Sequence, residues 1–161
     1  MKLELNKEYA RRHLFVTVIM AGLGLWFGYD GVVRYPATPA AELYRTIEGS
    51  DAPTGYDLEA FKRQKTQTQY GFSILSLLAA LIVGLRLYGA SRLSFEYDGS
   101  GFSYKGRRYD YADILEIDRR RWKSKTILVL KMKGGEKIIL DAWHHTGVKA
   151  FEQRLPAAPR T

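Results

Sequence analysis

Two long runs of uncharged and mostly apolar residues constrain this chain more than any other feature. They extend from Leu14 to Gly28 and from Tyr70 to Leu85. With its interfacial ends, each run reaches about 20 residues, which is the length that an α-helix needs to cross a bilayer. We therefore predict two transmembrane helices, at 14–33 and 70–89, in a chain of 161 residues.

The charges around these runs predict their orientation. Residues 1–13 carry four basic and two acidic residues, and the connector 31–69 carries five of each. Residues 90–161 carry fifteen basic and nine acidic residues, a net charge of +6. Because basic residues gather on the cytoplasmic side of membrane proteins, we expect both termini in the cytoplasm and the connector outside.

The first run has a charged start and an apolar centre, as a cleaved signal peptide also has. The residues at its end, 26–30, lack the pattern of small residues at which signal peptides are cleaved. We therefore favour an uncleaved membrane helix.

Small residues recur at a spacing of four in both predicted helices. Gly24 and Gly28 form a GxxxG pair in the first helix, and Ala80 and Gly84 form a similar pair in the second. Such spacing lets two helix backbones approach closely. The two interpretations are a dimerisation or docking face, and packing of the two helices against each other.

The connector at 34–69 is too short to form a catalytic domain. We expect one short helix over 40–48 and another over 56–69 that runs into the second membrane helix, with Asp57 near its cap. Its role is that of a solvated linker or of a contact for a partner outside the membrane.

After Gly89 the pattern changes from apolar runs to the alternation that is typical of strands. Residues 98–101 and 105–107 have turn composition, and a glycine pair follows at 134–135. A helix is predicted over 145–155, with Val148, Phe151 and Leu155 on one face. The predicted strands cover 93–97, 102–104, 108–111, 114–122, 126–132 and 137–140.

Three stretches of this unit, 96–104 (EYDGSGFSY), 111–118 (YADILEID) and 135–143 (GEKIILDAW), resemble bacterial pleckstrin-homology-like domains. The resemblance covers about 65 residues and rests on structural motifs: a hairpin turn, an aromatic-Asp-Ile entry to a strand and a glycine turn. It implies a curved antiparallel sheet capped by a C-terminal helix. It also implies binding or self-assembly beside a membrane, usually without catalysis.

The densest basic cluster lies at 119–125, on what we expect to be a strand and a hairpin tip. It is a candidate contact for anionic lipid head groups or an acidic partner, with Trp122 inserting at the interface. The competing interpretation is a solvated edge that opposes strand-to-strand aggregation. Its six members are Arg119, Arg120, Arg121, Trp122, Lys123 and Lys125.

Residues that carry catalytic or metal chemistry are few. The chain has no cysteine, and its three histidines are His13, His144 and His145. Asp141 near the last two suggests acid–base chemistry, but no nucleophile or oxyanion site accompanies them. We therefore expect a capping or surface role for these histidines, and neither a metal, a cofactor nor bound nucleic acid.

Together these features predict an α+β membrane protein, with a two-helix transmembrane hairpin followed by a small antiparallel β domain and a C-terminal helix. We expect a non-catalytic scaffold or accessory subunit of a bacterial inner membrane that contacts another membrane protein or itself. The alternative is a module that binds anionic lipid through residues 119–125. The expected divisions are an N-terminal segment at 1–13, helices at 14–33 and 70–89, the connector at 34–69, the β domain at 90–157 and a tail at 158–161.

Overall fold

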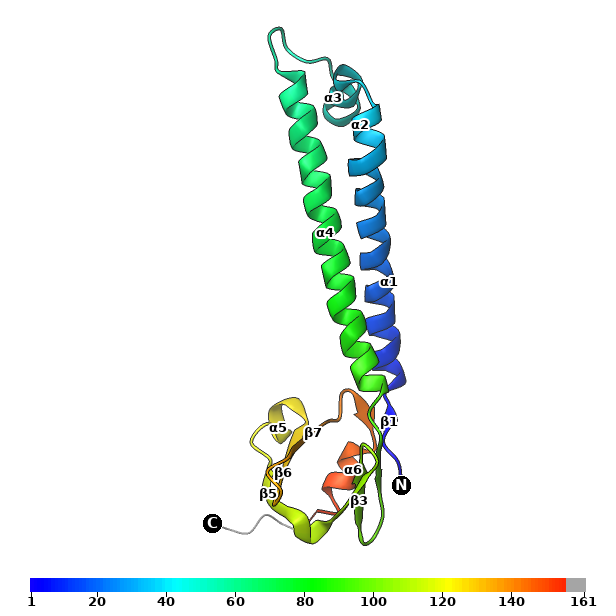
Figure 1. The fold of residues 1–161 in the computed structure, drawn as a ribbon, viewed down its shortest axis with the longest axis vertical. Coiled ribbons are helices and arrows are strands. Elements are labelled where there is room, and N and C mark those ends of the chain that lie inside the picture. Colours follow the sequence, from blue (N-terminus) through cyan, green and yellow to red (C-terminus); the bar gives the residue numbers. More distant parts are fainter. Residues whose placement is uncertain (156–161) are drawn as a thin grey trace. The chain divides into compact units, whose positions relative to one another are not determined.

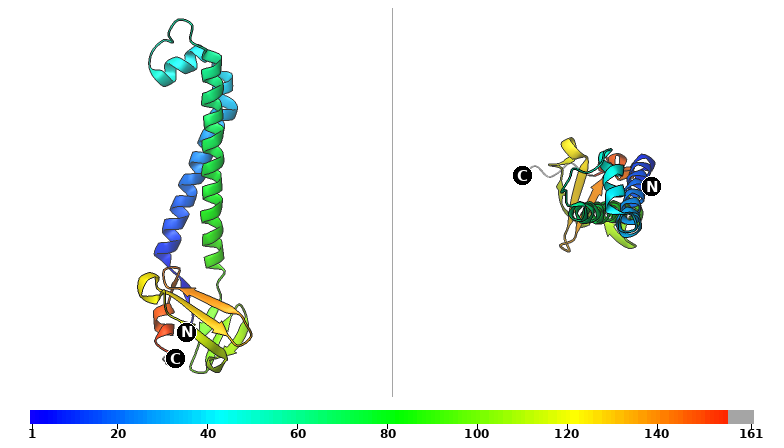
Figure 2. Two further views of the ribbon diagram at one scale, coloured as in Figure 1. Left: turned by 90° about the vertical axis from the view of Figure 1, so that its left-hand side faces the viewer. Right: turned by 90° about the horizontal axis from the view of Figure 1, so that it is seen from above.

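Both apolar runs fold as helices, and each helix is longer than its run. In the computed structural model, which describes residues 1–155, α1 spans Lys7–Tyr29 and α4 spans Leu58–Ser91. A π-helical segment, Asp30–Arg34, joins α1 to the short α2 (Tyr35–Ala37). Both long helices are long and apolar enough to cross a membrane, as judged by length and composition. Figures 1 and 2 show them side by side.

The described residues form two units. Together these units contain helices and small antiparallel sheets. One unit comprises His13–Leu85, and the other comprises Met1–Arg12 together with the chain from Arg86 onward. The division falls beside the ends of the apolar runs, so the change in hydropathy coincides with a change of structural unit.

The connector is folded. Its helix α3 (Ala40–Glu48) has the predicted bounds and ends at Gly49, whose φ of 75° is the left-handed conformation that favours glycine at a helix C-terminus. The predicted cap is also present, because Asp57 Oδ1 accepts a hydrogen bond from Ala60 N at 2.9 Å. Tyr35, Leu43 and Phe61 form a small buried cluster, which makes this segment more than a linker.

The alternating pattern after Gly89 forms two three-stranded antiparallel sheets in the orders β2-β3-β4 and β5-β6-β7. The glycine turns lie where the sequence predicts them, and Gly106 and Gly135 have φ values of 80° and 81°. The bounds are Phe95–Tyr97 for β2, Gly101–Tyr104 for β3, Arg107–Asp110 for β4, Ile114–Asp118 for β5, Ile127–Met132 for β6 and Lys137–Asp141 for β7. A 3₁₀ turn, Tyr111–Asp113, joins the two sheets.

One apolar core lies between these sheets and α6 (Val148–Glu152), whose place is visible in Figure 1. Phe151 is fully buried, and its ring centroid lies 4.9 Å from that of Phe95 and 5.0 Å from that of Tyr97. The predicted inward face of the last helix is therefore confirmed. The helix itself is shorter than predicted, because His145–Thr146 form strand β8 and not its first turn.

The N-terminal residues belong to the β unit, whereas the sequence predicts a separate segment at 1–13. Strand β1 (Glu4–Leu5) pairs antiparallel with β8, and Leu3 N donates a hydrogen bond to Phe95 O at 2.9 Å. Leu3 is buried in the same core as Phe95. The predicted tail at 158–161 and the last two residues of the predicted domain lie outside the described residues.

Candidate functional site

The basic cluster at 119–125 does not lie on a strand, so the predicted strand through Trp122 is wrong. Strand β5 ends at Asp118, a turn follows, and Trp122–Lys125 form the short helix α5 (Figure 1). Asp118 stabilises the turn, because its Oδ1 accepts two hydrogen bonds from Arg120. The donors are the Arg120 backbone N at 2.9 Å and the Arg120 Nε at 3.1 Å. These side chains therefore lie on a turn and a short helix.

Three members of the cluster make ion pairs or packing contacts within the β unit. Arg119 Nε donates to Glu152 Oε1 at 2.8 Å and joins the turn to α6. Arg120 pairs with Asp118 at 2.7 Å, and this hydrogen bond, with that from the Arg120 backbone, holds the pKa of Asp118 well below its usual range. Trp122 packs against the apolar core, so the predicted insertion of its ring into the interface finds no support in its position.

The other three members, Arg121, Lys123 and Lys125, are exposed, and so is Arg120 beside its pairing with Asp118. The cluster therefore offers four exposed cations on and beside α5, of which Arg120 is already paired with Asp118.

The small residues of the helices lie at the contact between α1 and α4. A Cβ atom added to Gly24 would lie 2.6 Å from Leu77 Cγ, and one added to Gly28 would lie 3.1 Å from Ser73 Oγ. Ser73 Oγ also donates a hydrogen bond to Gly24 O at 2.8 Å.

In the second pair, Ala80 is buried, and a Cβ atom on Gly84 would lie 3.6 Å from Thr17 Cγ2. This geometry is that of the two helices packing on each other, which is the second of the two sequence interpretations.

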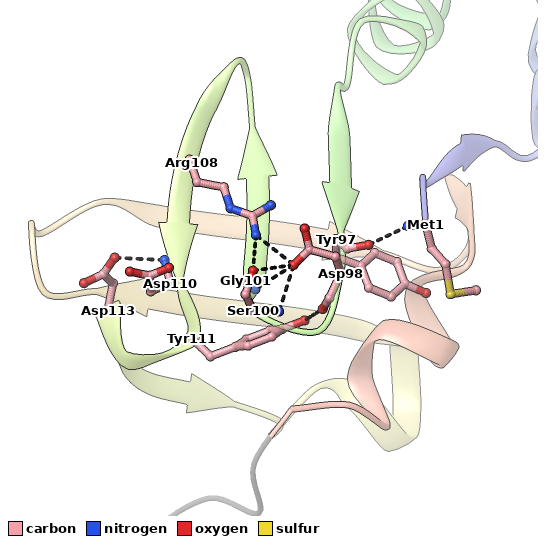
Figure 3. A network of polar contacts seen from close by, with 9 residues as sticks. All are labelled: Met1, Tyr97, Asp98, Ser100, Gly101, Arg108, Asp110, Tyr111 and Asp113. Atoms are coloured by element: carbon pink, nitrogen blue, oxygen red, sulfur yellow. Dashed lines mark hydrogen bonds and ion pairs between the residues drawn. The ribbon is translucent and has the colours of Figure 1, made fainter.

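An exposed polar network fixes the first hairpin (Figure 3). Asp98 Oδ1 accepts hydrogen bonds from Ser100 N at 2.8 Å, Gly101 N at 3.0 Å and Arg108 at 2.7 Å. These bonds, with that from Arg108 the strongest, keep the pKa of Asp98 well below its usual range. Tyr111 adds a bond from its hydroxyl to Asp98 O at 2.9 Å.

The network holds a turn and leaves Asp98 surrounded by donors, so we assign it to folding. Gly101 is required at this place, because a Cβ atom there would lie 2.2 Å from Tyr109 O, which belongs to the paired strand and cannot move aside.

The loop around His144 and His145 holds the ends of both long helices within the β unit, which sequence reasoning missed. His145 is buried, and its Nε2 donates to Ala90 O, near the end of α4, at 2.9 Å. On the α1 side, Asn6 N donates to His144 O at 2.8 Å, and the ring of Tyr9 lies 4.5 Å from that of His144.

Burial rules out the surface role for His145, whereas its bond to Ala90 O near the end of α4 agrees with the capping role, the other one that we expected. The available signal was the alternation of Leu3, Glu4 and Leu5 before Asn6, a good helix cap, which suggests a strand that leads into α1.

The outer face of the sheet β5-β6-β7 carries two exposed apolar side chains, which no sequence pattern predicted. Leu115 is 66% exposed and Ile139 is 55% exposed, and the residues on either side of Ile139 point into the core. On the same face, Lys131 Nζ of β6 pairs with Glu116 Oε2 of β5 at 2.6 Å. We call Leu115, Glu116, Lys131 and Ile139 the outer sheet face.

Among residues 1–155, no group of three His, Cys, Asp or Glu side chains could hold a metal ion. No protein-family model, no curated protein and no solved structure matches this chain. The resemblance to pleckstrin-homology-like domains therefore stays a prediction.

Proposed function

We propose that this chain is an integral membrane scaffold or accessory subunit of a bacterial inner membrane, whose pleckstrin-homology-like domain contacts another protein or a second copy. Helices α1 and α4 would cross the bilayer as a hairpin, with the connector outside and the β domain in the cytoplasm. The proposed activity is binding without catalysis.

The fold supports a topology in which both termini lie on the same side of the membrane. Residues Met1–Arg12 and the chain from Arg86 onward belong to one unit, so the starting end of α1 and the final end of α4 are joined to the same domain. A hairpin with an even number of crossings is consistent with this arrangement. The basic excess of residues 1–13 and 90–161 favours the cytoplasm for that side.

The observation that carries the binding proposal is the outer sheet face. Leu115 and Ile139 are exposed, with Leu115 next to Glu116 of the ion pair with Lys131 and Ile139 opposite Val129 on the central strand. Exposed apolar side chains around a polar pair give the mixed surface that is common in non-obligate protein interfaces. The strands that carry this face are packed on the buried core by their opposite side.

The experiment is purification of the full-length protein in mild detergent, followed by native mass spectrometry. A stoichiometric partner or a closed homo-oligomer supports the proposal. The double variant Leu115→Asp with Ile139→Asp should then lose the partner or the second copy while the domain stays folded. The matched control removes charge elsewhere, with Arg121→Gln and Lys123→Gln, and should leave the complex intact.

The alternative function is anionic-lipid binding through the cluster at 119–125, which the exposure of Arg121, Lys123 and Lys125 favours. It predicts a monomer that retains anionic lipid, and loss of that lipid in the charge control described above. A protein that stays monomeric and carries no lipid would contradict both functions.

A further inference from the structure

A pocket beside the end of α4 is a second candidate for lipid contact, separate from the basic cluster. Its volume is about 450 Å³, and its walls are formed by residues 2–5 of the N-terminal segment and residues 91–94 that follow α4. This volume falls within the range of about 300–1,000 Å³ that is typical of sites for small molecules.

The walls of this pocket are fixed by the fold. Leu3 N donates to Phe95 O at 2.9 Å, and Lys105 N donates to Ser94 O at 3.0 Å. The Leu3 side chain is 2% exposed, and Gly147 leaves just enough room for it, since a Cβ atom there would lie 3.0 Å from Leu3 Cδ2. These contacts hold both walls of the pocket in place.

The chemistry of the pocket suits an anion. Two cations, Lys2 and Arg92, stand against one carboxylate, Glu4. Lys2 is bound only loosely, with its Nζ 3.7 Å from Glu96 Oε1 and its side chain 62% exposed. Within residues 1–155, neither the terminal nitrogens of Arg92 nor the hydroxyl of Ser94 takes part in a hydrogen bond.

The position of Arg92 along the chain places it at the height of lipid head groups, if α4 crosses the membrane. The apolar run ends at Leu85, and at 1.5 Å per residue Arg92 follows about 10 Å beyond it. Its side chain folds back by one turn, with Nε 3.1 Å from the Tyr88 hydroxyl and the guanidinium 5.0 Å from the centre of that ring. Tyrosine and arginine at this depth are typical of the membrane interface.

We propose that the pocket formed by residues 2–5 and 91–94 binds the phosphate of an anionic phospholipid head group through Arg92, Lys2 and Ser94. The inference rests on the membrane insertion proposed above and is independent of the partner contact. A soluble phosphate compound would present the same chemistry, and the test separates the two sources.

The test uses the full-length protein in mild detergent, with added dioleoylphosphatidylglycerol or dioleoylphosphatidylcholine, and native mass spectrometry to measure bound lipid. We expect preference for phosphatidylglycerol, about fivefold weaker binding for Arg92→Gln and wild-type binding for Arg92→Lys. The double variant of Lys2→Gln with Arg92→Gln should lose about 25-fold. The matched control is Arg121→Gln with Lys123→Gln, which removes two exposed cations from α5 and should bind as wild type does.

Three results would overturn the proposal. Equal retention of both lipids would show that no anion site exists, and loss of lipid in the control but not in Arg92→Gln would move the contact to α5. Competition by glycerol 3-phosphate at the same affinity as the lipid would identify a soluble ligand. Circular dichroism of each variant checks folding, and recovery of the protein in the aqueous fraction without detergent would refute membrane insertion itself.

Discussion

Substitution of Gly24 by alanine tests the contact between the two long helices most sharply. The added Cβ atom would lie 2.6 Å from Leu77 Cγ, 2.7 Å from Leu77 Cδ2 and 3.2 Å from Leu77 N. Leu77 must then change its side-chain conformation or the helices must separate. The matched control is Gly22→Ala, because nothing lies within 4 Å of a Cβ atom at Gly22.

The comparison of these two variants isolates the cost of the contact. Alanine gains about 0.5–1 kcal/mol over glycine in a helix, and both variants share this gain. Overfilling a packed contact costs about 1–3 kcal/mol, and only Gly24→Ala bears it. We therefore expect Gly24→Ala to be about 1–3 kcal/mol less stable than Gly22→Ala.

Thermal unfolding followed by circular dichroism in mild detergent measures this difference. At about 2–4 °C for each kcal/mol in a chain of this size, Gly24→Ala should unfold at least about 2 °C below Gly22→Ala. Leu77→Ala removes the two closest atoms, so the added cost of Gly24→Ala should shrink in that background. Equal midpoints for Gly24→Ala and Gly22→Ala would refute the packing of this face against α4.

Two further variants test the β unit, each by thermal unfolding with a matched control. Because hydrogen bonding depresses the pKa of Asp98, its ionised form stabilises the fold above about pH 4, and this stabilisation is lost as the pH falls through the folded-state pKa. Asp98→Asn should therefore lower the unfolding midpoint at pH 6 and reduce the drop in that midpoint between pH 6 and pH 3. The matched control is Leu115→Ala, which removes no titratable group from the same unit and should show the wild-type drop. Phe151→Ala should cost about 3–5 kcal/mol because its fully buried ring leaves a cavity, and Leu115→Ala should cost little; a small loss for Phe151→Ala would contradict the assigned core.

Local pattern was enough to predict most elements of this fold. The long helices, the helix at 40–48 and the hairpin turns each follow from residues close together in the chain, such as the apolar runs, Asp57 and Gly135. The inward positions of Val148 and Phe151 also follow from local periodicity, although the helix that carries them is shorter than predicted.

Contacts between distant residues account for what the sequence did not reveal. The membership of residues 1–12 in the β unit depends on pairing of Glu4 with Thr146, and the place of His145 depends on Ala90. The prediction of a strand through Trp122 is wrong for one local reason and one that depends on distant residues. Asp118 ends it by bonding Arg120, and Trp122 turns into a core that only the complete fold creates.

The candidate site was predictable only in outline. The sequence identified the basic residues at 119–125, but which of them form ion pairs within the domain depends on the positions of Asp118 and Glu152. Neither the outer sheet face nor the pocket beside Arg92 has a sequence signature, because each joins segments that are far apart in the chain.

The most direct test of the central claim, a membrane hairpin with both ends in one cytoplasmic domain, is the labelling of single cysteines. The chain contains no cysteine, so Ser50→Cys in the connector and Ser124→Cys in α5 each introduce one exposed thiol. In intact bacterial cells, a membrane-impermeant maleimide should label Ser50→Cys, and it should label Ser124→Cys only after lysis. Labelling of Ser124→Cys in intact cells, or release of the protein from membranes by alkaline carbonate, would contradict the account.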